Sequence, residues 1–341
     1  MTVKTQTLLR EQAARKQQAT AIAHPNIAFI KYWGKIDEKL NLPANRSVSM
    51  NLAALTTVTT VEFRPGLRVD TVTINDRPAD GQAVDRVSRH LDWVRSLSGT
   101  SMRARVVSRN DFPAGTGLAS SSSAFAALSL AATQAAGLEL SERDLSRLAR
   151  LGSGSACRSV PAGYCLWEGD SDETSFARQV AHPGHWDLAD VIGIVDLGHK
   201  EVGSQDGHAL APTSPLHEAR LAAVPGWLRI VLEGIDQRDL AAMGPSLETE
   251  ALAMHGVMMT SMPSLLYWTA GTVTVLEAVR NWRRGGLEVY FTLDAGPNVH
   301  CLCEAKDALE VEKRLRNLEG VEDVLVSGVG EGVRLVAYHL F

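Results

Sequence analysis

The sequence contains only four cysteines among 341 residues, at positions 157, 165, 301 and 303. Their spacing fits neither a zinc site nor a disulfide framework, so we expect buried thiols in a reducing compartment, the cytoplasm. The formal net charge is −5 with both signs mixed along the chain, which is not the basic surface of a nucleic-acid-binding protein. The longest stretch of low polarity, 123–137, is too short and too rich in polar side chains to span a bilayer. We therefore expect a small-molecule partner, with no nucleic acid and no membrane.

The first twenty residues lack the apolar core of a secretory signal. The chain, 45% hydrophobic, is long enough for two packed lobes. Helices and strands mix without strict βαβ alternation, which indicates an α+β fold. Composition places the boundary between the lobes near 183–189. The expected parts are an N-terminal extension 1–20, an N-terminal lobe 21–187 and a C-terminal lobe 188–341.

Hydrophobic periodicity predicts the main elements of both halves. Alternating β-branched residues between 21 and 63 predict strands, and apolar residues at helical spacing predict a helix at 83–99. The second half is expected to contain helices at 216–233 and 264–284, and strands at 191–198, 287–296 and 332–341. The methionine-rich stretch 254–262 is expected to pack in the core or on a helix face.

The stretch FPAGTGLASSSSAFAAL, 112–128, combines glycines with four consecutive serines at the start of a predicted helix. Glycines let backbone N–H groups converge, and a helix N-terminus adds unpaired N–H groups and a positive dipole end. The stretch matches neither common nucleotide-binding glycine motif. A phosphate site and an ordinary loop before a buried helix are about equally compatible with it. The candidate phosphate-binding residues are Gly115, Gly117, Ser120, Ser121 and Ser122.

A second glycine–hydroxyl stretch, GSGSACRS at 152–159, adds an arginine. The guanidinium of Arg158 presents a rigid fork that can bind a carboxylate or phosphate through two parallel hydrogen bonds. On this segment alone, a surface arginine is the more common alternative. Two such loops in one chain nevertheless favour two separate anionic groups.

Two further stretches carry charged groups near predicted strand ends. NIAFIKYWGK, 26–35, holds an amide, two ammonium groups and two aromatic rings, although on this segment alone an edge strand with aromatic packing and solvated lysines is the favoured interpretation. FTLDAGPN, 291–298, places Asp294 at the end of an apolar strand. Such an aspartate commonly forms a turn, but inside a cationic cleft it would be a candidate base or orienting group.

Together these four stretches, in this order, resemble the mevalonate diphosphate decarboxylases, a family of the GHMP kinase superfamily that has phosphomevalonate decarboxylases among its relatives. The resemblance extends over about residues 20–340. It implies an N-terminal lobe like ribosomal protein S5 domain 2, a ferredoxin-like C-terminal lobe and an active site between them. It also implies ATP and Mg²⁺ as cofactors and a homodimer.

The reaction implied by the resemblance is the ATP-dependent decarboxylation of mevalonate 5-diphosphate to isopentenyl diphosphate, in the mevalonate pathway. Asp294 then matches the catalytic aspartate that orients or deprotonates the C3 hydroxyl, and Lys31 supplies positive charge beside it. Arg158 and Asn26 would position the substrate carboxylate. Ser121 matches the serine that reaches the ATP phosphates and magnesium. Contacts to the substrate phosphate carry over to Tyr32, Lys35, Arg86, Ser153, Ser155 and Ser204.

The sequence departs from the family pattern near the expected phosphate end. Arg46 stands where a small polar residue is usual and becomes a further candidate for substrate binding, and Leu151 stands where a basic residue is common. These changes leave mevalonate 5-phosphate, giving isopentenyl phosphate, as an alternative substrate. A mevalonate 3-kinase without decarboxylation and a non-catalytic sensor are disfavoured, because Asp294, Lys31 and Arg158 are all present.

Overall fold

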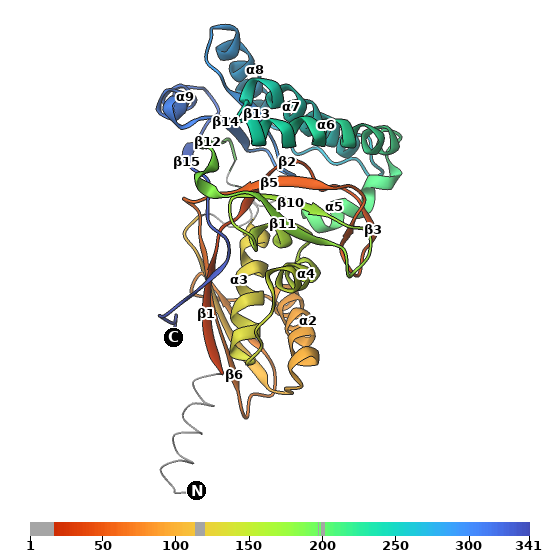
Figure 1. The fold of residues 1–341 in the computed structure, drawn as a ribbon, viewed down its shortest axis with the longest axis vertical. Helices are drawn as coiled ribbons and strands as arrows, with labels where there is room; N and C mark the ends of the chain where they lie inside the picture. Colours follow the sequence, from red (N-terminus) through yellow and green to blue (C-terminus); the bar gives the residue numbers. More distant parts are fainter. Residues whose placement is uncertain (1–16, 113–119, 197, 199–201) are drawn as a thin grey trace, which may run out of the picture.

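The computed structural model describes residues 17–112, 120–196, 198 and 202–341, which form two lobes stacked along the longest axis of the molecule (Figure 1). The expected two-lobed α+β fold is confirmed. Gly115 and Gly117, expected to bind phosphate, lie outside the described residues, as does most of the expected extension 1–20. No helix in the described part of the chain is long and apolar enough to cross a bilayer.

The N-terminal lobe is built on a six-stranded sheet. Its strands lie in the order β16 (Arg334–Val336), β1 (Gln18–Ala23), β6 (Thr57–Arg64), β9 (Arg103–Asn110), β7 (Thr71–Ile74) and β8 (Arg77–Pro78). All neighbours are antiparallel except β7 and β9. Its helices are α2 (Gly81–Ser98), α3 (Ser120–Ala135) and α4 (Glu142–Gly152). Small buried side chains, such as Ala127 and Ala131, let α3 lie close against β1 and β6.

The end of the chain returns to the N-terminal lobe. β16 pairs with β1, with Ala21 opposite Leu335. His339, which follows β16, also contacts β1, because its Nδ1 lies 2.7 Å from Thr20 Oγ1. The expected division at 187/188 would place this segment in the C-terminal lobe, whereas its strand completes the N-terminal sheet. Pairing with β16 occupies the hydrogen-bonding edge that β1 would otherwise expose.

A second sheet lies between the N-terminal sheet and the C-terminal helices (Figure 1). Its antiparallel strands lie in the order β11 (Phe176–Ala181), β10 (Tyr164–Glu168), β5 (Ser47–Asn51) and β2 (Asn26–Ile30). The ribbon of β3 (Lys35–Asp37) and β4 (Leu42–Pro43) follows β2, and the short 3-10 helix η1 (Gly154–Ser159) follows α4. Every residue of β2 and β5 is buried, because other elements cover both faces of these strands.

The C-terminal lobe contains a four-stranded antiparallel sheet in the order β13 (Tyr290–Thr292), β14 (Val299–Glu304), β12 (Leu188–Ile194) and β15 (Asp323–Ser327). Its helices are α5 (Ser204–Leu210), α6 (His217–Gln237), α7 (Leu240–Met259), α8 (Ala270–Arg284) and α9 (Ala308–Arg316). Short 3-10 helices are η2 (Pro183–His185), η3 (Ala211–Thr213) and η4 (Ala305–Asp307). Along the chain, β12 is followed by helices, then by β13 and β14, then by α9 and finally by β15. This β-α-β-β-α-β order is that of the expected ferredoxin-like lobe.

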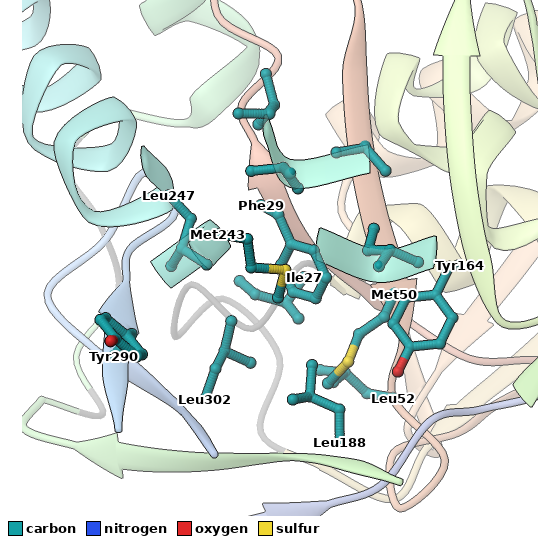
Figure 2. Close-up of a cluster of buried hydrophobic side chains, with 14 of the residues drawn as sticks. Ile27, Phe29, Met50, Leu52, Tyr164, Leu188, Met243, Leu247, Tyr290 and Leu302 are labelled. Carbon is teal, nitrogen blue, oxygen red and sulfur yellow. The ribbon is translucent and has the colours of Figure 1, made fainter. Parts of the chain in front are cut away.

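One hydrophobic cluster joins the middle sheet to the C-terminal lobe. Figure 2 shows members of this cluster from β2, β5, β10, β12, α7, β13 and β14 and from the residue after β5, namely Ile27, Phe29, Met50, Leu52, Tyr164, Leu188, Met243, Leu247, Tyr290 and Leu302. Burying a large apolar side chain contributes roughly 1.5–3 kcal/mol, so the cluster firmly ties the two parts together. Lys31, directly after β2, and Asp294, just after β13, consequently come together although they are far apart in the sequence.

Two helical glycines provide a matched test of this packing. A Cβ at Gly244 of α7 would lie 2.3 Å from the Tyr290 ring, whereas a Cβ at Gly226 of α6 would meet nothing within 4 Å. We expect Gly226→Ala to raise the free energy of unfolding by about 0.5–1 kcal/mol through helix propensity. Gly244→Ala should lower it by about 1–3 kcal/mol through overpacking. Urea unfolding of both variants measures the difference, and stabilisation by both would contradict the contact between α7 and β13.

Candidate active site

A cavity of about 750 Å³ is lined by residues of both lobes. Its wall includes the residue after β2, the N-terminal turns of α2 and α3, the segment around η1, the start of α5 and the segment after β13. The expected site residues that line it are Lys31, Tyr32, Lys35, Arg86, Ser120, Ser121, Ser153, Ser155, Arg158, Ser204 and Asp294. The fold therefore gathers into one space residues from all four sequence stretches, together with Arg86 and Ser204 from outside them.

Of the expected residues that the structure describes, three do not line the cavity. Asn26 is buried behind Arg158 and donates to Ser155 O and Ser159 Oγ, at 3.1 and 2.8 Å. Ser122 is fully buried, because one further step along α3 turns its side chain from the cavity towards the core. Both residues can act on a ligand only through their neighbours.

Arg46 is the third, and the structure does not place its side chain in the cavity wall. Its side chain is 64% exposed, and its Nη1 lies 3.8 Å from Glu168 Oε2. The physical reason is strand alternation, since the next residue, Ser47, points towards Arg158 and Arg46 points the other way. The departure from the family pattern at this position therefore does not add a cation to the cavity wall.

Lys31 and Asp294 form the central ion pair of the cavity. Lys31 Nζ donates to Asp294 Oδ1 at 2.8 Å, and the side chains are 2% and 25% exposed. Burial by itself would raise the pKa of Asp294, but the electrostatic influence of its neighbours, above all the Lys31 ammonium with its hydrogen bond and also the Arg158 guanidinium, outweighs burial and holds that pKa below its ordinary value. Asp294 is therefore a carboxylate at neutral pH, and it can accept a hydrogen bond from a substrate hydroxyl.

Arg158 is a buried cation that faces the cavity. Its Nη1 donates to Ser47 Oγ at 2.6 Å, and its Nε donates to Ser49 Oγ at 3.1 Å and to Asn26 Oδ1 at 3.3 Å. Among the described residues, no carboxylate lies within ion-pair distance of its guanidinium. Burial lowers the pKa of Arg158, yet an arginine stays charged. A buried charge without a counter-ion is costly, so this position favours an anionic ligand.

Hydroxyl groups gather where α3 begins. Ser121 Oγ lies 3.1 Å from Ser153 Oγ, so α3 and the segment before η1 present adjacent donors to the cavity. Helix N-termini attract anions through their free N–H groups and dipole. Magnesium commonly binds phosphate oxygens and retains waters rather than occupying an all-protein cage. This donor set fits a nucleotide phosphate with an associated magnesium ion.

Tyr32 is held between two rings next to this site. Its ring centroid lies 4.6 Å from that of Trp167 and 4.1 Å from that of His208. Gly154 is required here, since a Cβ would come within 2.5 Å of the Tyr32 ring. The Tyr32 hydroxyl has no hydrogen-bond partner among the described residues, and burial raises its pKa well above the ordinary value. It therefore stays protonated and can donate to a ligand oxygen.

A cluster of cations lines another part of the cavity. Lys35 Nζ bonds Glu38 at 2.7 Å, and Arg86 Nη2 donates to Gly152 O at 3.1 Å. Burial lowers the pKa of Arg86. Arg89 also lines the cavity, which the sequence analysis missed. Its position three residues after Arg86 on a predicted helix was the signal that could have identified it.

Acidic side chains and a histidine were also missed. Asp80, Asp85 and Asp206 line the cavity together with the cations. His208 accepts a hydrogen bond at Nδ1 from Gly34 N at 3.1 Å, and burial lowers its pKa well below the ordinary value. His208 is therefore neutral and serves as a packing partner of Tyr32.

Comparisons with known proteins identify both halves of the chain. The diphosphomevalonate decarboxylase-like N-terminal domain matches residues 23–177, and the mevalonate 5-diphosphate decarboxylase C-terminal domain matches residues 191–332. Diphosphomevalonate decarboxylase mvd1 of Aspergillus fumigatus is 33% identical over 89% of this chain and 81% of its own length. Phosphomevalonate decarboxylase of Haloferax volcanii is 32% identical over 92% of this chain and 96% of its own.

A solved structure extends these similarities to three dimensions. The complex of MDDEF with MVAPP, AMPPCP and magnesium superposes with a TM-score of 0.88 at 39% sequence identity. The match covers 94% of this chain and 99% of that one. The similarity thus spans both lobes and the cavity between them.

Proposed function

Because the chain belongs to the mevalonate diphosphate decarboxylase family, we propose that it catalyses the ATP-dependent decarboxylation of mevalonate 5-diphosphate to isopentenyl diphosphate. ADP, phosphate and CO2 would be the other products, and the pathway would be isoprenoid biosynthesis from mevalonate. The observation that carries the proposal is that the Lys31–Asp294 ion pair and the unpaired Arg158 line the same cavity. A kinase that stops after phosphorylation does not need a buried cation for the substrate carboxylate.

Asp294 and Lys31 would act on the C3 hydroxyl of the substrate. Asp294 Oδ accepts the hydroxyl hydrogen bond and orients the oxygen for attack on phosphorus. Since the pKa of Asp294 is low, its carboxylate is a weak base, and it takes the proton only as the new O–P bond forms. The Lys31 ammonium stabilises negative charge on the reacting oxygens. The pair therefore combines orientation with electrostatic stabilisation.

ATP supplies the phosphoryl group, and magnesium neutralises charge on its phosphates. Ser120 and Ser121 are the described residues that would hold those phosphates, with Ser121 the candidate magnesium ligand. MDDEF, a relative of the same fold, has been solved in complex with AMPPCP and magnesium, which supports ATP and Mg²⁺ as the ligands of this cavity. Fixed donors in the cavity wall reduce the reorganisation that phosphoryl transfer requires.

Arg158 would then hold the substrate carboxylate while phosphate leaves C3. Asn26, Ser47 and Ser49 bind its Nε and Nη1, which fixes the guanidinium plane, and its remaining N–H groups can donate to the carboxylate. The electron pair of the breaking C–C bond fills the developing cationic centre at C3 and forms the alkene, with release of CO2. Tyr32, Lys35, Arg86, Ser153, Ser155 and Ser204 are the candidates for the substrate phosphate.

Mevalonate 5-phosphate is the second candidate substrate. The relative that favours it is the Haloferax volcanii phosphomevalonate decarboxylase, which matches this chain about as well as the Aspergillus enzyme does. Because Arg46 points away from the cavity, the cations available for the distal phosphate are Lys35, Arg86 and Arg89. These residues can serve one phosphate group or two.

The proposal is tested in three separate reactions, each containing the purified protein, ATP and magnesium. The substrate is mevalonate in the first, its 5-phosphate in the second and its 5-diphosphate in the third. ADP and CO2 are recorded together. Equal release of both from one phosphorylated substrate is the expected outcome and identifies the number of phosphates. ADP without CO2 would identify a kinase and contradict the assignment of Arg158.

The cellular setting is part of the same proposal. We place the enzyme in the cytoplasm, an assignment supported by its four buried free cysteines. Burial raises the pKa of Cys157 and Cys303 to about 12, which keeps both thiols protonated and unreactive.

The homodimer implied by family membership predicts twice the mass of the chain in light scattering, and a monomer would contradict it.

A further inference from the structure

We infer that Arg220 and Glu250, a buried ion pair of α6 and α7, are positioning residues that hold the main chain of Lys31 for the proposed reaction. The inference rests on the proposed function. Their side chains are only 1% and 0% exposed, and Arg220 Nε donates to Glu250 Oε1 at 3.1 Å, with a second bond from Nη2 to the same oxygen. Neither residue lines the cavity. Any effect on catalysis therefore passes through the residues that they contact.

Both main-chain polar groups of Lys31 are bound by this pair. Lys31 N donates to Glu250 Oε2 at 3.1 Å, and Arg220 Nη2 donates to Lys31 O at 2.9 Å. Lys31 lies one residue beyond the end of β2, where the strand ladder no longer supplies partners. Buried N–H and C=O groups need such partners, so the ion pair replaces the ladder at this position.

Further contacts fix the same turn. Arg220 Nη1 donates to Trp33 O at 3.3 Å and to Asn45 Oδ1 at 3.4 Å. Asn45 Nδ2 in turn donates to Lys31 O at 2.9 Å. The rigid guanidinium fork thus binds three acceptors around the turn that carries Lys31 and Tyr32 into the cavity. A single flexible ammonium could not make these bonds together.

Helix α7 also contacts the other member of the central ion pair. His255 Nε2 lies 3.1 Å from Asp294 O, while Glu250 of the same helix binds Lys31 N. One helix therefore contacts the main chain on both sides of the 2.8 Å bond between Lys31 Nζ and Asp294 Oδ1. Loss of the Glu250 contact should change the position of Lys31 relative to Asp294.

The test removes both charges together, because removal of one would leave an uncompensated buried charge. In Arg220→Met/Glu250→Leu, we expect kcat for CO2 release to fall by roughly 10- to 100-fold, the order of effect that misplaced reacting groups produce. KM for ATP should change by less than about 2-fold, because neither residue lies among the phosphate-binding groups.

The pH profile separates positioning from general stability. The titratable groups that influence the pKa of Asp294 are Lys31, His300 and Arg158. If Lys31 moves away, burial raises the pKa of Asp294 and the acid limb of kcat moves to higher pH. A purely structural pair would leave this limb in place.

Arg95 and Asp70 supply the matched control. They form another buried ion pair, 3.0 Å from Nη2 to Oδ2, in which Asp70 Oδ1 also accepts a main-chain hydrogen bond, from Ala104 N at 2.8 Å. Neither residue lines the cavity. Arg95→Met/Asp70→Leu should lower the unfolding temperature and leave kcat and its acid limb unchanged.

The possible results separate this inference from the proposed function. Wild-type kcat and an unmoved acid limb in Arg220→Met/Glu250→Leu would overturn the inference and leave the decarboxylase assignment standing. Absence of CO2 release by the wild type would overturn both. If the double variant does not fold, Arg220→Lys decides, since it keeps a charge opposite Glu250 but loses the fork. In this variant kcat should fall and the acid limb of kcat should move to higher pH. If neither changes, the positioning role of Arg220 is refuted.

Discussion

Replacement of Asp294 with asparagine is expected to reduce the rate of CO2 release by a factor of about 10³, within the range that general acid–base groups contribute. Asparagine keeps the size and one acceptor oxygen but cannot take the proton of the C3 hydroxyl. It also removes the negative charge that faces Lys31 Nζ at 2.8 Å. Both the orientation of the hydroxyl and the charge balance of the cavity are therefore lost.

The measurement is kcat for ADP and CO2, together with thermal unfolding to show that the variant is folded. Glu168→Gln is the matched control. Like Asp294, whose side chain is 25% exposed, Glu168 is a partly exposed carboxylate, at 31%, and it forms an ion pair, with Arg178 at 3.1 Å. Unlike Asp294, it does not line the cavity. It should retain wild-type kcat. Full turnover by Asp294→Asn would contradict the mechanism proposed for the Lys31–Asp294 pair.

Replacement of Arg158 with lysine is expected to reduce CO2 release by about 10²-fold, the order of effect associated with small misplacements of reacting groups. Lysine keeps a positive charge but loses the planar fork. Without that fork, the bonds to Ser47, Ser49 and Asn26 that fix its plane cannot all form. The substrate carboxylate would then be attracted but poorly oriented.

Because Arg158 is assigned to the carboxylate and not to phosphoryl transfer, ADP formation should fall less than CO2 release in this variant. The ratio of CO2 to ADP is thus expected to drop below one in single-turnover experiments. Arg95→Lys, at a buried arginine away from the cavity, provides the control and should leave the ratio unchanged. Equal losses of both products would refute a separate role for Arg158 in holding the carboxylate.

Local sequence patterns predicted some elements better than others. The helix expected at 83–99 is α2 (Gly81–Ser98), and the methionine-rich stretch 254–262 begins with the buried Met254 and Met258 of α7. The rest of α7 was not predicted. Its buried residues occur on many sides, because α6, β2 and β13 all pack against it, so the sequence has little helical periodicity to detect.

The residues of the candidate site, like the helices and strands, were predicted only in part. Glycine–hydroxyl stretches, a lysine after a strand and an aspartate before a turn are local patterns, and most of the residues that they predicted line the cavity. The direction of Arg46, one residue before β5, was not predicted, because it depends on how β5 pairs with β2 and β10. Arg220 and Glu250 carried no local signal, because each acts through a residue more than 180 positions away in sequence.

The sequence by itself determined the chemistry available to this protein: which stretches offer hydroxyls, cations and a carboxylate, and which strands and helices can carry them. The tertiary structure alone decided which of these groups meet. Periodicity and turn propensity act over a few residues, whereas the Lys31–Asp294 bond joins positions 263 residues apart and forms only when the hydrophobic cluster packs β2 against α7 and the C-terminal sheet. Burial then set the charge states, because the pKa of a carboxylate or guanidinium depends on neighbours that long-range packing brings together.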